Sequence, residues 1–575
     1  MPIKDDILIG QMLIKEGVIT PEQLEAGLIE QKKTGNFICA TLVKLGFAPE
    51  DKIFNVLSRQ LHTPYIKLRG CEISLEVIQK VPAKFASHYK IMPVEFTDNI
   101  LVIAMADPLD IRTIDDLKLL LSLEIKGALS SEWEIQEAIR RYYGVGAETI
   151  ERMVSQKGPF EELSIPLEKA EDVEALAEDA SVIKVVNQIL SEAIKERATD
   201  VHLEPFANEL RARFRIDGVL YDINTPESIK YFHLAIVSRI KIMAHLNIAE
   251  RRLPQDGRIK VKVGQQELDL RVSIIPTIFG EAVQIRILSL SFFLELEKLG
   301  LRQEDLRLIE SFIIKPHGVV FVTGPTGSGK STTLYAALAR INSDANKIIT
   351  IEDPIEYQMR GINQIQANPQ IGLTFAAALR HMLRHDPDVM MVGEVRDAET
   401  AEIAIRSALT GHLVFSTLHT NDAAGAITRL LDMGIEPFLV SSSLECLIAQ
   451  RLVRLVCPKC KVPVKNPAET LNFIYKEIPC GIRQAEIYEG KGCQECRFTG
   501  YRGRTGIYEI LPISEPIREL ILNHASSQQI KKQALNEGMR TLRHDGLEKV
   551  LAGLTTYAEV MRVTQLEHQL KNDEV

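Results

Sequence analysis

Near the middle of the chain, the apolar run Gly318-Val-Val-Phe-Val-Thr323 leads directly into Gly324-Pro-Thr-Gly-Ser-Gly-Lys330-Ser331-Thr332 and the helix-forming run 333–340. A buried strand, a glycine-rich loop ending in Lys-Ser and a helix make, in this order, a complete P-loop. Its glycines let backbone N–H groups turn inward and cradle phosphates at a helix N-terminus. The sequence therefore predicts that ATP binds on Gly324, Pro325, Thr326, Gly327, Ser328, Gly329, Lys330, Ser331 and Thr332.

Within this loop, Lys330 and Ser331 have separate tasks. The Lys330 ammonium is expected to reach the β and γ phosphates, and the Ser331 hydroxyl is expected to hold Mg²⁺. Three further apolar runs, 348–351, 389–392 and 413–418, are interpreted as strands of the same parallel sheet. Ligands gather at the carboxyl ends of such strands, so the residues that follow these runs are expected to meet at the nucleotide.

The residues that follow those runs carry the chemistry of hydrolysis. Glu394 is predicted to orient and deprotonate the attacking water, because it follows its strand whereas Asp388 precedes its strand and is expected to be structural. Glu352 and Glu356 either position Mg²⁺ through water or cap a local turn. His419 either donates a hydrogen bond to the γ phosphate or is a buried histidine satisfied by its neighbours.

Length and composition describe a protein of several domains. The chain has 575 residues, of which 45% are hydrophobic and 25% charged, enough for about three to five domains. A formal net charge of -9 and a pI near 5.9 argue against nucleic acid as a partner. The start of the chain shows no basic and apolar leader, and no uninterrupted apolar run reaches about 18 residues, so a cytoplasmic location is expected.

Four of the eight cysteines form two CxxC pairs, Cys457/Cys460 and Cys493/Cys496. Two such pairs offer four thiolates to a tetrahedral Zn²⁺ ion and leave no open position, which is typical of a structural site. A role without metal and a redox pair are the alternatives. The other cysteines are expected to be small buried apolar residues: Cys39, Cys71, Cys446 and Cys480.

An internal repeat opens the chain. Apolar residues recur there at a spacing of 29, as in Ile9 and Ile38, and each copy contains a glycine and a proline-containing turn. Duplication of a helical hairpin is the simplest interpretation. We expect a first domain over residues 1–147 that contains these hairpins, and a flexible acidic linker over 148–180.

Further along the chain, patterning predicts an α+β domain and then the ATPase. The segment 210–216 alternates strictly between apolar and polar residues, which predicts a strand with Arg211, Arg213 and Arg215 on one face. The predicted parts are an α+β domain over 181–292, an ATPase core over 293–450, a four-cysteine subdomain over 451–500 and a helical region over 501–575.

From Ala198 to Gly506 the motif series resembles that of the type II secretion and type IV pilus assembly ATPases. The series is specific and covers most of the chain. In that family the segments that start at 350, 379 and 410 are the Asp box, the Walker B segment with its catalytic glutamate, and the His box. Besides the P-loop and the CxxC pairs, the matching segments are ATDVHLEP (198–205), FRIDG (214–218), RLPQDGR (252–258), RVSIIPTIFGE (271–281), TIEDPIEY (350–357), LRHMLRHDPDVMMVGEVRD (379–397), TGHLVFSTLHTN (410–421) and GYRGRTGIYE (500–509).

The resemblance implies an α/β multidomain fold, with a helical N-terminal repeat domain, a PAS-like α+β second domain, and a RecA-like P-loop core that carries a zinc-ribbon insertion and a helical C-terminus. It also implies a homohexamer whose nucleotide sites lie between the RecA-like domain and the domain before it. A cation delivered by a moving domain stabilises charge in the transition state, although each arginine is alternatively a surface ion pair. The family's arginine positions correspond here to Arg271, Arg286, Arg380 and Arg396.

The N-terminal repeat resembles a tandem-motif domain that binds cyclic di-GMP in some relatives, where each copy begins with an Arg-Leu-Gly triplet. The corresponding triplets here are Leu8-Ile9-Gly10 and Phe37-Ile38-Cys39. Both guanidinium groups and one glycine are missing, which disfavours cyclic di-GMP. The resemblance implies instead that this domain docks on an inner-membrane platform protein or a cytoplasmic adaptor, which places the protein peripherally on the inner face of the cytoplasmic membrane.

Three functions follow, in order of preference. The first is a motor ATPase that drives assembly of type IV pili or of a type II secretion pseudopilus. The second is a P-loop nucleic-acid translocase or a DNA-uptake ATPase, which the acidic pI, the single Trp and the lack of a basic tract disfavour. The third is a scaffold that binds ATP without turnover, which the set Lys330, Glu394 and His419 disfavours.

Overall fold

A computed structural model describes residues 4–34, 38–107, 110–157, 177, 179–263, 266–289, 295–478 and 485–564. The chain divides into two compact units, Met1–Leu288 and Ser289–Val575, and each unit is described by itself. Most of the predicted acidic linker, as well as Phe37 and Cys480, lies outside the described residues. None of the described helices is both long and apolar enough to cross a membrane.

The first unit opens with two helical hairpins, which confirms the prediction from the repeat. Gly17 and Gly46 follow the first helix of each hairpin with φ angles of 68° and 74°, a conformation that glycine adopts without strain. Ile9 and Ile38, which occupy the same place in the two copies, are both fully buried. The four helices are α1 (Lys4–Lys15), α2 (Pro21–Thr34), α3 (Ile38–Lys44) and α4 (Glu50–Leu61).

A small three-stranded sheet follows these hairpins. Its order is β1-β2-β3, with β1 antiparallel and β3 parallel to β2. A further helix occupies the beginning of the predicted linker. The elements are α5 (Leu75–Gln79), α6 (Ala83–Tyr89), β1 (Met92–Thr97), β2 (Ile100–Met105), α7 (Ile111–Leu121), β3 (Glu124–Leu129), α8 (Glu132–Tyr143) and α9 (Ala147–Lys157).

The rest of the first unit is a six-stranded sheet in the order β6-β5-β4-β9-β8-β7. Helices α11 and α12 pack on its apolar face, where Val201 and Phe214 are buried, while Arg211 and Arg213 lie on the other face. The elements are α11 (Ala180–Lys195), β4 (Asp200–Pro205), β5 (Leu210–Ile216), β6 (Val219–Ile223), α12 (His233–Met243), β7 (Gln255–Val263), β8 (Gln266–Thr277) and β9 (Gly280–Ser289).

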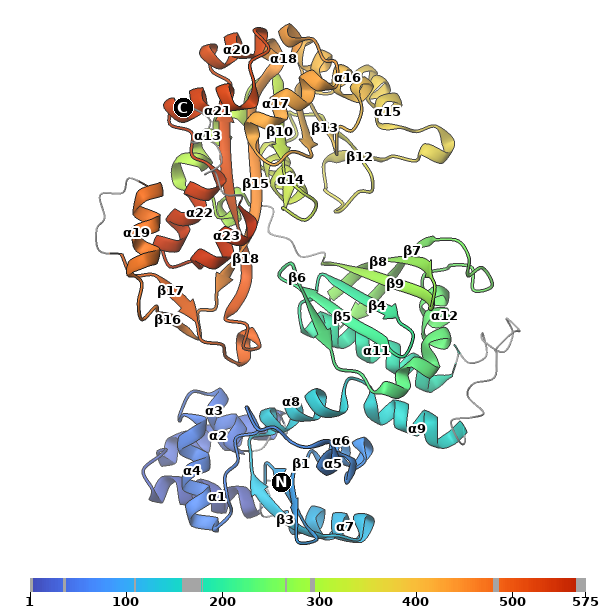
Figure 1. Cartoon of the computed structure of the whole chain (residues 1–575), viewed down its shortest axis with the longest axis vertical. Coiled ribbons are helices and arrows are strands. Elements are labelled where there is room, and N and C mark those ends of the chain that lie inside the picture. The colour runs from blue at the N-terminus through green and yellow to red at the C-terminus, as the bar shows by residue number, and fades with distance from the viewer. Residues whose placement is uncertain are drawn as a thin grey trace, which may run out of the picture. The chain divides into compact units, whose positions relative to one another are not determined.

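The second unit is built on a seven-stranded sheet in the order β12-β11-β13-β14-β10-β15-β18 (Figure 1). Six neighbouring strands are parallel, and only the edge strand β18 runs antiparallel. The carboxyl ends of the P-loop strand and of the three predicted strands therefore meet at one edge, as expected. The strands are β10 (Gly318–Thr323), β11 (Ile348–Glu352), β12 (Ile362–Gln366), β13 (Val389–Val392), β14 (Leu413–Leu418), β15 (Leu444–Val456) and β18 (Tyr501–Pro512).

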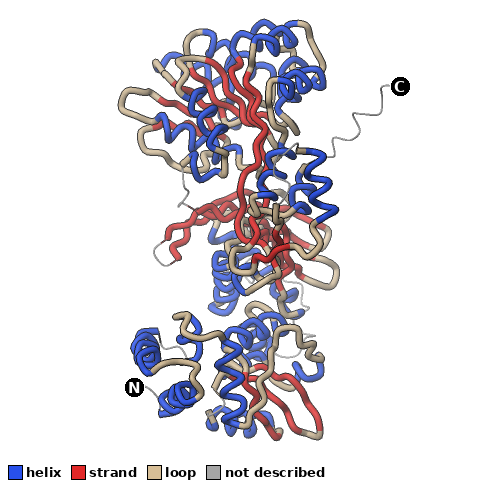
Figure 2. Tube along the Cα trace, turned by 90° about the vertical axis from the view of Figure 1, so that its left-hand side faces the viewer, coloured by secondary structure: helices blue, strands red, loops and turns tan. Residues whose placement is uncertain are grey.

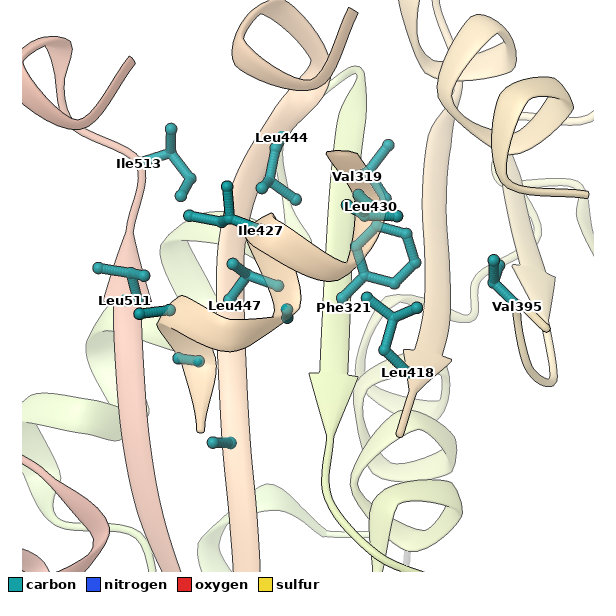
Figure 3. Packing of buried hydrophobic residues seen from close by; sticks show 14 of the residues in the cluster. Val319, Phe321, Val395, Leu418, Ile427, Leu430, Leu444, Leu447, Leu511 and Ile513 are labelled. Atoms are coloured by element: carbon teal, nitrogen blue, oxygen red, sulfur yellow. The ribbon is translucent and has the colours of Figure 1, made fainter. Parts of the chain in front are cut away.

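Helices cover both faces of this sheet. Val319 and Phe321 of β10 pack toward α15 to α18 and α20, whereas Val320 and Val322 pack toward α13 and α14. Figure 3 shows Val319 and Phe321 beside Leu430 of α17 in the first of these cores. The alternation along one strand thus builds a layered α/β/α unit. The helices are α13 (Gln303–Ile313), α14 (Lys330–Ile341), α15 (Phe375–Met382), α16 (Ala398–Leu409), α17 (Ala423–Asp432), α18 (Pro437–Ser443) and α20 (Glu515–Leu522).

The region predicted to be a helical C-terminus begins instead with strand β18, so that prediction is wrong for 501–512. The glycines of GYRGRTG hide the period of a strand, and antiparallel pairing with β15 supplies hydrogen bonds to β18. β15 and β18 are labelled in Figure 1, and Figure 2 shows the strands of the chain in red. The remaining elements are β16 (Lys461–Pro463), α19 (Ala468–Glu477), β17 (Tyr488–Gly490), α21 (Ser527–Asn536), α22 (Leu542–Leu551) and α23 (Tyr557–Val563), with 3-10 turns at Glu227–Phe232, Leu296–Leu299, Pro369–Ile371, Leu383–His385 and Gln494–Cys496.

Candidate nucleotide site and cysteine cluster

The loop between β10 and α14 has the backbone shape that holds phosphate. Gly324, Gly327 and Gly329 have φ angles of 152°, 80° and 88°, which side chains other than hydrogen rarely tolerate. A Cβ atom at Gly324 would lie 2.6 Å from both the Gln450 carbonyl oxygen and the Ser328 Oγ. Helix α14 begins at Lys330, so its free N–H groups open toward the loop.

The polar groups of this loop have few partners within the protein. Lys330 is buried, and among the described residues its Nζ donates to two carbonyl oxygens, those of Gly324 at 2.8 Å and Pro325 at 3.1 Å. Burial lowers the pKa of Lys330 to about 8, a shift that the Glu394 carboxylate opposes. The buried Ser328 Oγ has no hydrogen-bond partner among the described residues. This donor set fits phosphate oxygens.

Two residues predicted from strand ends lie together at this edge. The Glu394 Oε1 is 2.6 Å from the Arg396 Nη2, and the Glu394 Oε2 is 3.5 Å from the His419 Nε2. The side chain of His419 is 46% exposed, so it is not the buried, satisfied histidine of the alternative interpretation. The structure therefore brings a carboxylate, an imidazole and a guanidinium together. The Glu394 carboxylate is also close enough to Lys330 to act on its pKa, which it raises against the effect of burial.

Glu352 ends β11 and is held from three sides. The hydroxyl of Tyr335, the hydroxyl of Thr350 at 2.6 Å and the amide of Gln364 at 3.2 Å all donate to its buried carboxylate. The Tyr335 Oη in turn accepts from the backbone N–H of Glu356 at 3.3 Å. This network ties the helix after the P-loop to the Asp-box segment. A place beside Mg²⁺ for either glutamate stays a prediction.

The predicted arginines occupy several places. Arg380 pairs with the exposed Glu399 in the second unit. In the first unit, Arg286 Nε lies 2.9 Å from the Asp200 Oδ1, and Arg271 of β8 faces Arg258 of β7 in register.

Asp388, by contrast, has a structural partner. Its carboxylate accepts the backbone N–H of Lys347 at 2.7 Å, which agrees with the structural role predicted for it.

Sequence reasoning missed two residues at the P-loop, Gln450 and Arg451 of β15. Gln450 is buried, and its Oε1 accepts from the Thr333 hydroxyl at 2.7 Å. A Cβ atom at Gly329 would lie 2.8 Å from the Gln450 Nε2. The available signal was the same as for the other strands, because both residues directly follow the apolar run 446–449.

The four predicted zinc ligands converge, with all their sulfur atoms within 4.8 Å of one another. Three Sγ pairs measure 3.7, 3.7 and 3.8 Å: Cys457 with Cys493, Cys460 with Cys496, and Cys493 with Cys496. Tetrahedral Zn–S bonds of about 2.3 Å place sulfur atoms about 3.8 Å apart. The cluster therefore fits a zinc ion.

The other described cysteines do not join this cluster. Cys39 and Cys446 are buried, as expected, whereas Cys71 is partly exposed.

Comparison with known proteins places this chain among secretion and pilus proteins. The model of the family described as "Type II/IV secretion system protein" matches residues 175–562, and that of the MshEN domain matches residues 61–149. The type IV pilus assembly ATPase PilB of Myxococcus xanthus is 46% identical over 558 residues, which cover 96% of this chain and 98% of that protein. The type II secretion system protein E of Dickeya dadantii is 46% identical over 449 residues, which cover 77% of this chain and 88% of that protein.

Among solved structures, the pilus retraction motor PilT with bound ADP is 29% identical, covers 66% of this chain and 97% of its own, and has a TM-score of 0.44. MshE with cdg is also 29% identical, covers 24% of this chain and 98% of its own, and has a TM-score of 0.22. The family model spans more than half of the sequence, and the two relatives match over 98% and 88% of their own length. The chain therefore belongs to the type II/IV secretion system protein family.

Proposed function

We propose that this protein is a hexameric motor ATPase that drives assembly of a type IV pilus or of a type II secretion pseudopilus. The observation that carries the proposal is the meeting of Glu394 and His419 beside the P-loop lysine, at the carboxyl edge of β10, β13 and β14. Pilus assembly and type II secretion are named in two relatives that are each 46% identical to this chain.

Each residue at this edge has a role in hydrolysis. Lys330 leaves its two carbonyl partners and binds the β and γ phosphates. Glu394 accepts a proton from water as the water oxygen bonds to the γ phosphorus and the bond to the β–γ bridging oxygen breaks, which releases ADP and phosphate. His419 donates to a γ-phosphate oxygen. The Ser331 hydroxyl would hold Mg²⁺, which would supply positive charge to offset the charge of the phosphates.

Arginines complete the site in this proposal. Arg271 and Arg286 from the PAS-like domain, with Arg380 and Arg396 from the RecA-like core, neutralise transition-state charge between neighbouring subunits. Three of these arginines are paired with carboxylates, Arg286 with Asp200, Arg380 with Glu399 and Arg396 with Glu394, which hold the side chains in place until domains close. Because domain closure is coupled to hydrolysis, the free energy of ATP hydrolysis drives motion against a cytoplasmic platform at the inner membrane.

The N-terminal helices are proposed to bind a membrane-associated platform or adaptor protein and not cyclic di-GMP. At the two triplet positions, Ile9 and Ile38 are buried in the helical core. Cys39 occupies the place of Gly10 and is also buried. No arginine stands at either triplet to stack on guanine. The four-cysteine cluster is proposed to bind zinc in a structural ribbon.

The deciding experiment measures Mg²⁺-dependent ATP hydrolysis and ATP affinity of the full chain beside Glu394→Gln. The substitution keeps the shape of the side chain but removes the base, so turnover is expected to fall about 10²–10⁴-fold while ATP still binds. Glu402→Gln is the matched control, because Glu402 pairs with Arg406 on the exposed face of α16. Size-exclusion chromatography on each sample tests whether activity follows the hexamer.

Three results would count against the proposal. Wild-type turnover by Glu394→Gln would remove the assigned base and pass the role to Glu356 or Glu352. An inert wild-type hexamer that binds ATP would favour the scaffold. Stimulation by DNA in place of a platform protein would favour the translocase.

A further inference from the structure

Strand β15 does not stop at the carboxyl edge of the sheet but continues past the P-loop. In the parallel pairing of β10 with β15, Ala449 lies opposite Thr323, the last residue of β10. Gln450 and Arg451 therefore stand level with the start of the phosphate loop. By the rule that ligands gather beyond parallel strand ends, these positions belong to a fifth strand that faces the nucleotide.

The guanidinium of Arg451 reaches both the P-loop and the His-box loop. Its Nη1 would lie 3.0 Å from a Cβ atom at Gly324, the first residue of the phosphate loop. The same Nη1 donates to the Gln450 carbonyl oxygen at 3.2 Å. Its Nη2 donates to the carbonyl and side-chain oxygens of Asn421, at 3.1 and 3.2 Å, two residues after His419.

All of these partners are neutral oxygens. No carboxylate oxygen of the described residues lies within 4.0 Å of the Arg451 guanidinium, although the side chain is partly buried. Three other partly buried arginines of the second unit are ion-paired: Arg454 with Glu559 at 2.8 Å, Arg302 with Asp305 at 2.8 Å, and Arg518 with Glu445 at 3.8 Å. A half-buried cation without a paired anion is typical of a site that receives one.

The electrostatics agree with this geometry. Burial lowers the pKa of Arg451, and the more distant carboxylates of Glu509 and Asp422 only partly oppose it. The charge of Arg451 also contributes to the lowered pKa of Lys330, which places both cations in one local field. Two cations that destabilise each other in the free protein are both stabilised when an anion enters between them.

We propose that Arg451 is a direct ligand of the terminal phosphates of ATP, contributed by the same subunit as the P-loop. The proposal rests on the proposed function, in which that loop binds ATP. The planar guanidinium fork presents paired donors that match phosphate oxygens, which lysine does not provide. Because Arg451 also holds Asn421, its move to a phosphate links occupancy of the P-loop to the loop that carries His419.

The experiment compares ATP and ADP affinity of the full chain, with Mg²⁺ present, by isothermal titration calorimetry. Arg451→Gln is expected to weaken ATP binding about tenfold, as for loss of one charge-assisted hydrogen-bonded contact. Arg451→Lys keeps the charge and is expected to retain more affinity than Arg451→Gln, yet to bind at least about threefold more weakly than wild type. Arg406→Gln, on the exposed face of α16, is the matched control and is expected to bind as wild type does.

Melting temperatures without nucleotide separate binding from a structural role. If Arg451 binds phosphate, Arg451→Gln is expected to have a melting temperature close to that of wild type without nucleotide. Its melting temperature is then expected to rise less than that of wild type when ATP is added. ATP affinity within about threefold of wild type would overturn the proposal, whatever the melting temperature. If Arg451→Gln does not fold, Arg451→Lys applies the same threshold. Lys330→Ala separates failure of the Arg451 proposal from failure of the proposed function. If wild type and Lys330→Ala bind ATP equally, the proposed function itself fails.

Discussion

Two pairs of cations, one on each large sheet of this protein, have different kinds of partner. On the open face of the six-stranded sheet in the first unit, Arg213 is held by both oxygens of Glu204 at 2.8 Å, and Arg286 is held by the buried Asp200 at 2.9 Å. At the carboxyl edge of the second sheet, Lys330 and Arg451 have carbonyl and amide oxygens as hydrogen-bond partners.

This difference indicates which cations can bind an incoming anion without first losing a carboxylate partner. A carboxylate partner stabilises and positions an arginine, so an incoming phosphate has to compete with that carboxylate. A cation held only by dipoles is less stable in the free protein and gains more when phosphate arrives. Instability in the free state is therefore an indication of the binding site, and the paired arginines are expected to act only after their partners are exchanged.

The largest expected effects come from substituting one unpaired cation, Lys330, and one paired cation, Arg213. Lys330→Met is expected to weaken ATP binding about a hundredfold or more, since it removes a charged contact to phosphate. Its melting temperature without nucleotide is not expected to fall, because a buried cation without a carboxylate partner has been removed. Arg213→Met is expected to lower the melting temperature by about 2–4 °C, as for loss of a partly exposed ion pair, with ATP affinity close to wild type. Differential scanning calorimetry and titration calorimetry measure both quantities.

The comparison would fail if Arg213→Met lost ATP affinity as Lys330→Met does. In that case the open face of the first sheet would already take part in nucleotide binding.

An intermediate effect uses pH to test the state of Lys330. Its pKa of about 8 lies below the ordinary lysine value, so the free protein loses this charge as the pH rises through 8. ATP affinity is then expected to fall by up to about tenfold per pH unit above that point, with uptake of a proton on binding. The stability of the nucleotide-free protein changes in the opposite direction. Burying the charged amine destabilises the fold below about pH 8, and this cost is relieved as the pH rises. Titration calorimetry in buffers of different ionisation enthalpy counts the proton.

Lys330→Arg is the control, because arginine stays protonated throughout this range. A pH profile for wild type as flat as that of Lys330→Arg would show that Lys330 keeps its ordinary pKa.

The smallest expected effect concerns Asp200, the carboxylate partner of Arg286. Burial alone would raise the pKa of Asp200, but the hydrogen bond and charge of Arg286, with hydrogen bonds from Thr199 and Gln284, lower it overall. A carboxylate with a lowered pKa contributes stability above its ordinary pKa and loses it as pH falls through the folded value. Asp200→Asn is expected to lower the melting temperature at pH 7 by about 2–4 °C, with the difference from wild type narrowing below pH 4.

Asp222→Asn provides the matched control, because Asp222 pairs with Arg211 on the same face but is 63% exposed. It is expected to change the melting temperature by less than Asp200→Asn. Equal losses in the two variants would show that burial of the carboxylate does not matter.

Much of the candidate site was readable from local sequence. The P-loop, the strands that end at Glu352 and just before Glu394 and His419, and the convergence of the four cysteines were all predicted and are confirmed as geometry. Each depends on a short pattern, an apolar run followed by polar residues or a CxxC pair, that occupies neighbouring positions in the chain. The catalytic roles assigned to these residues stay predictions.

Other features were not readable because their partners lie far apart in the chain. Glu352 was predicted to act near Mg²⁺ or at a turn, but its three donors come from α14, β11 and β12. Strand β18 was interpreted as part of a helical region, since its glycines obscure the alternation that marks a strand. Arg451 looked like any other arginine until pairing of β15 with β10 placed it beside Gly324.

Short sequence patterns predict the groups of the candidate site: a phosphate-binding loop, a carboxylate and a histidine after parallel strands, and four thiols at metal spacing. Local patterns suffice for these because periodicity and loop geometry act over a few residues. Only the tertiary structure decided which cations are paired and which are not, and which strand closes the sheet. Those outcomes depend on contacts between residues such as Arg451 and Asn421, 30 positions apart, whose meeting is set by the packing of the whole unit.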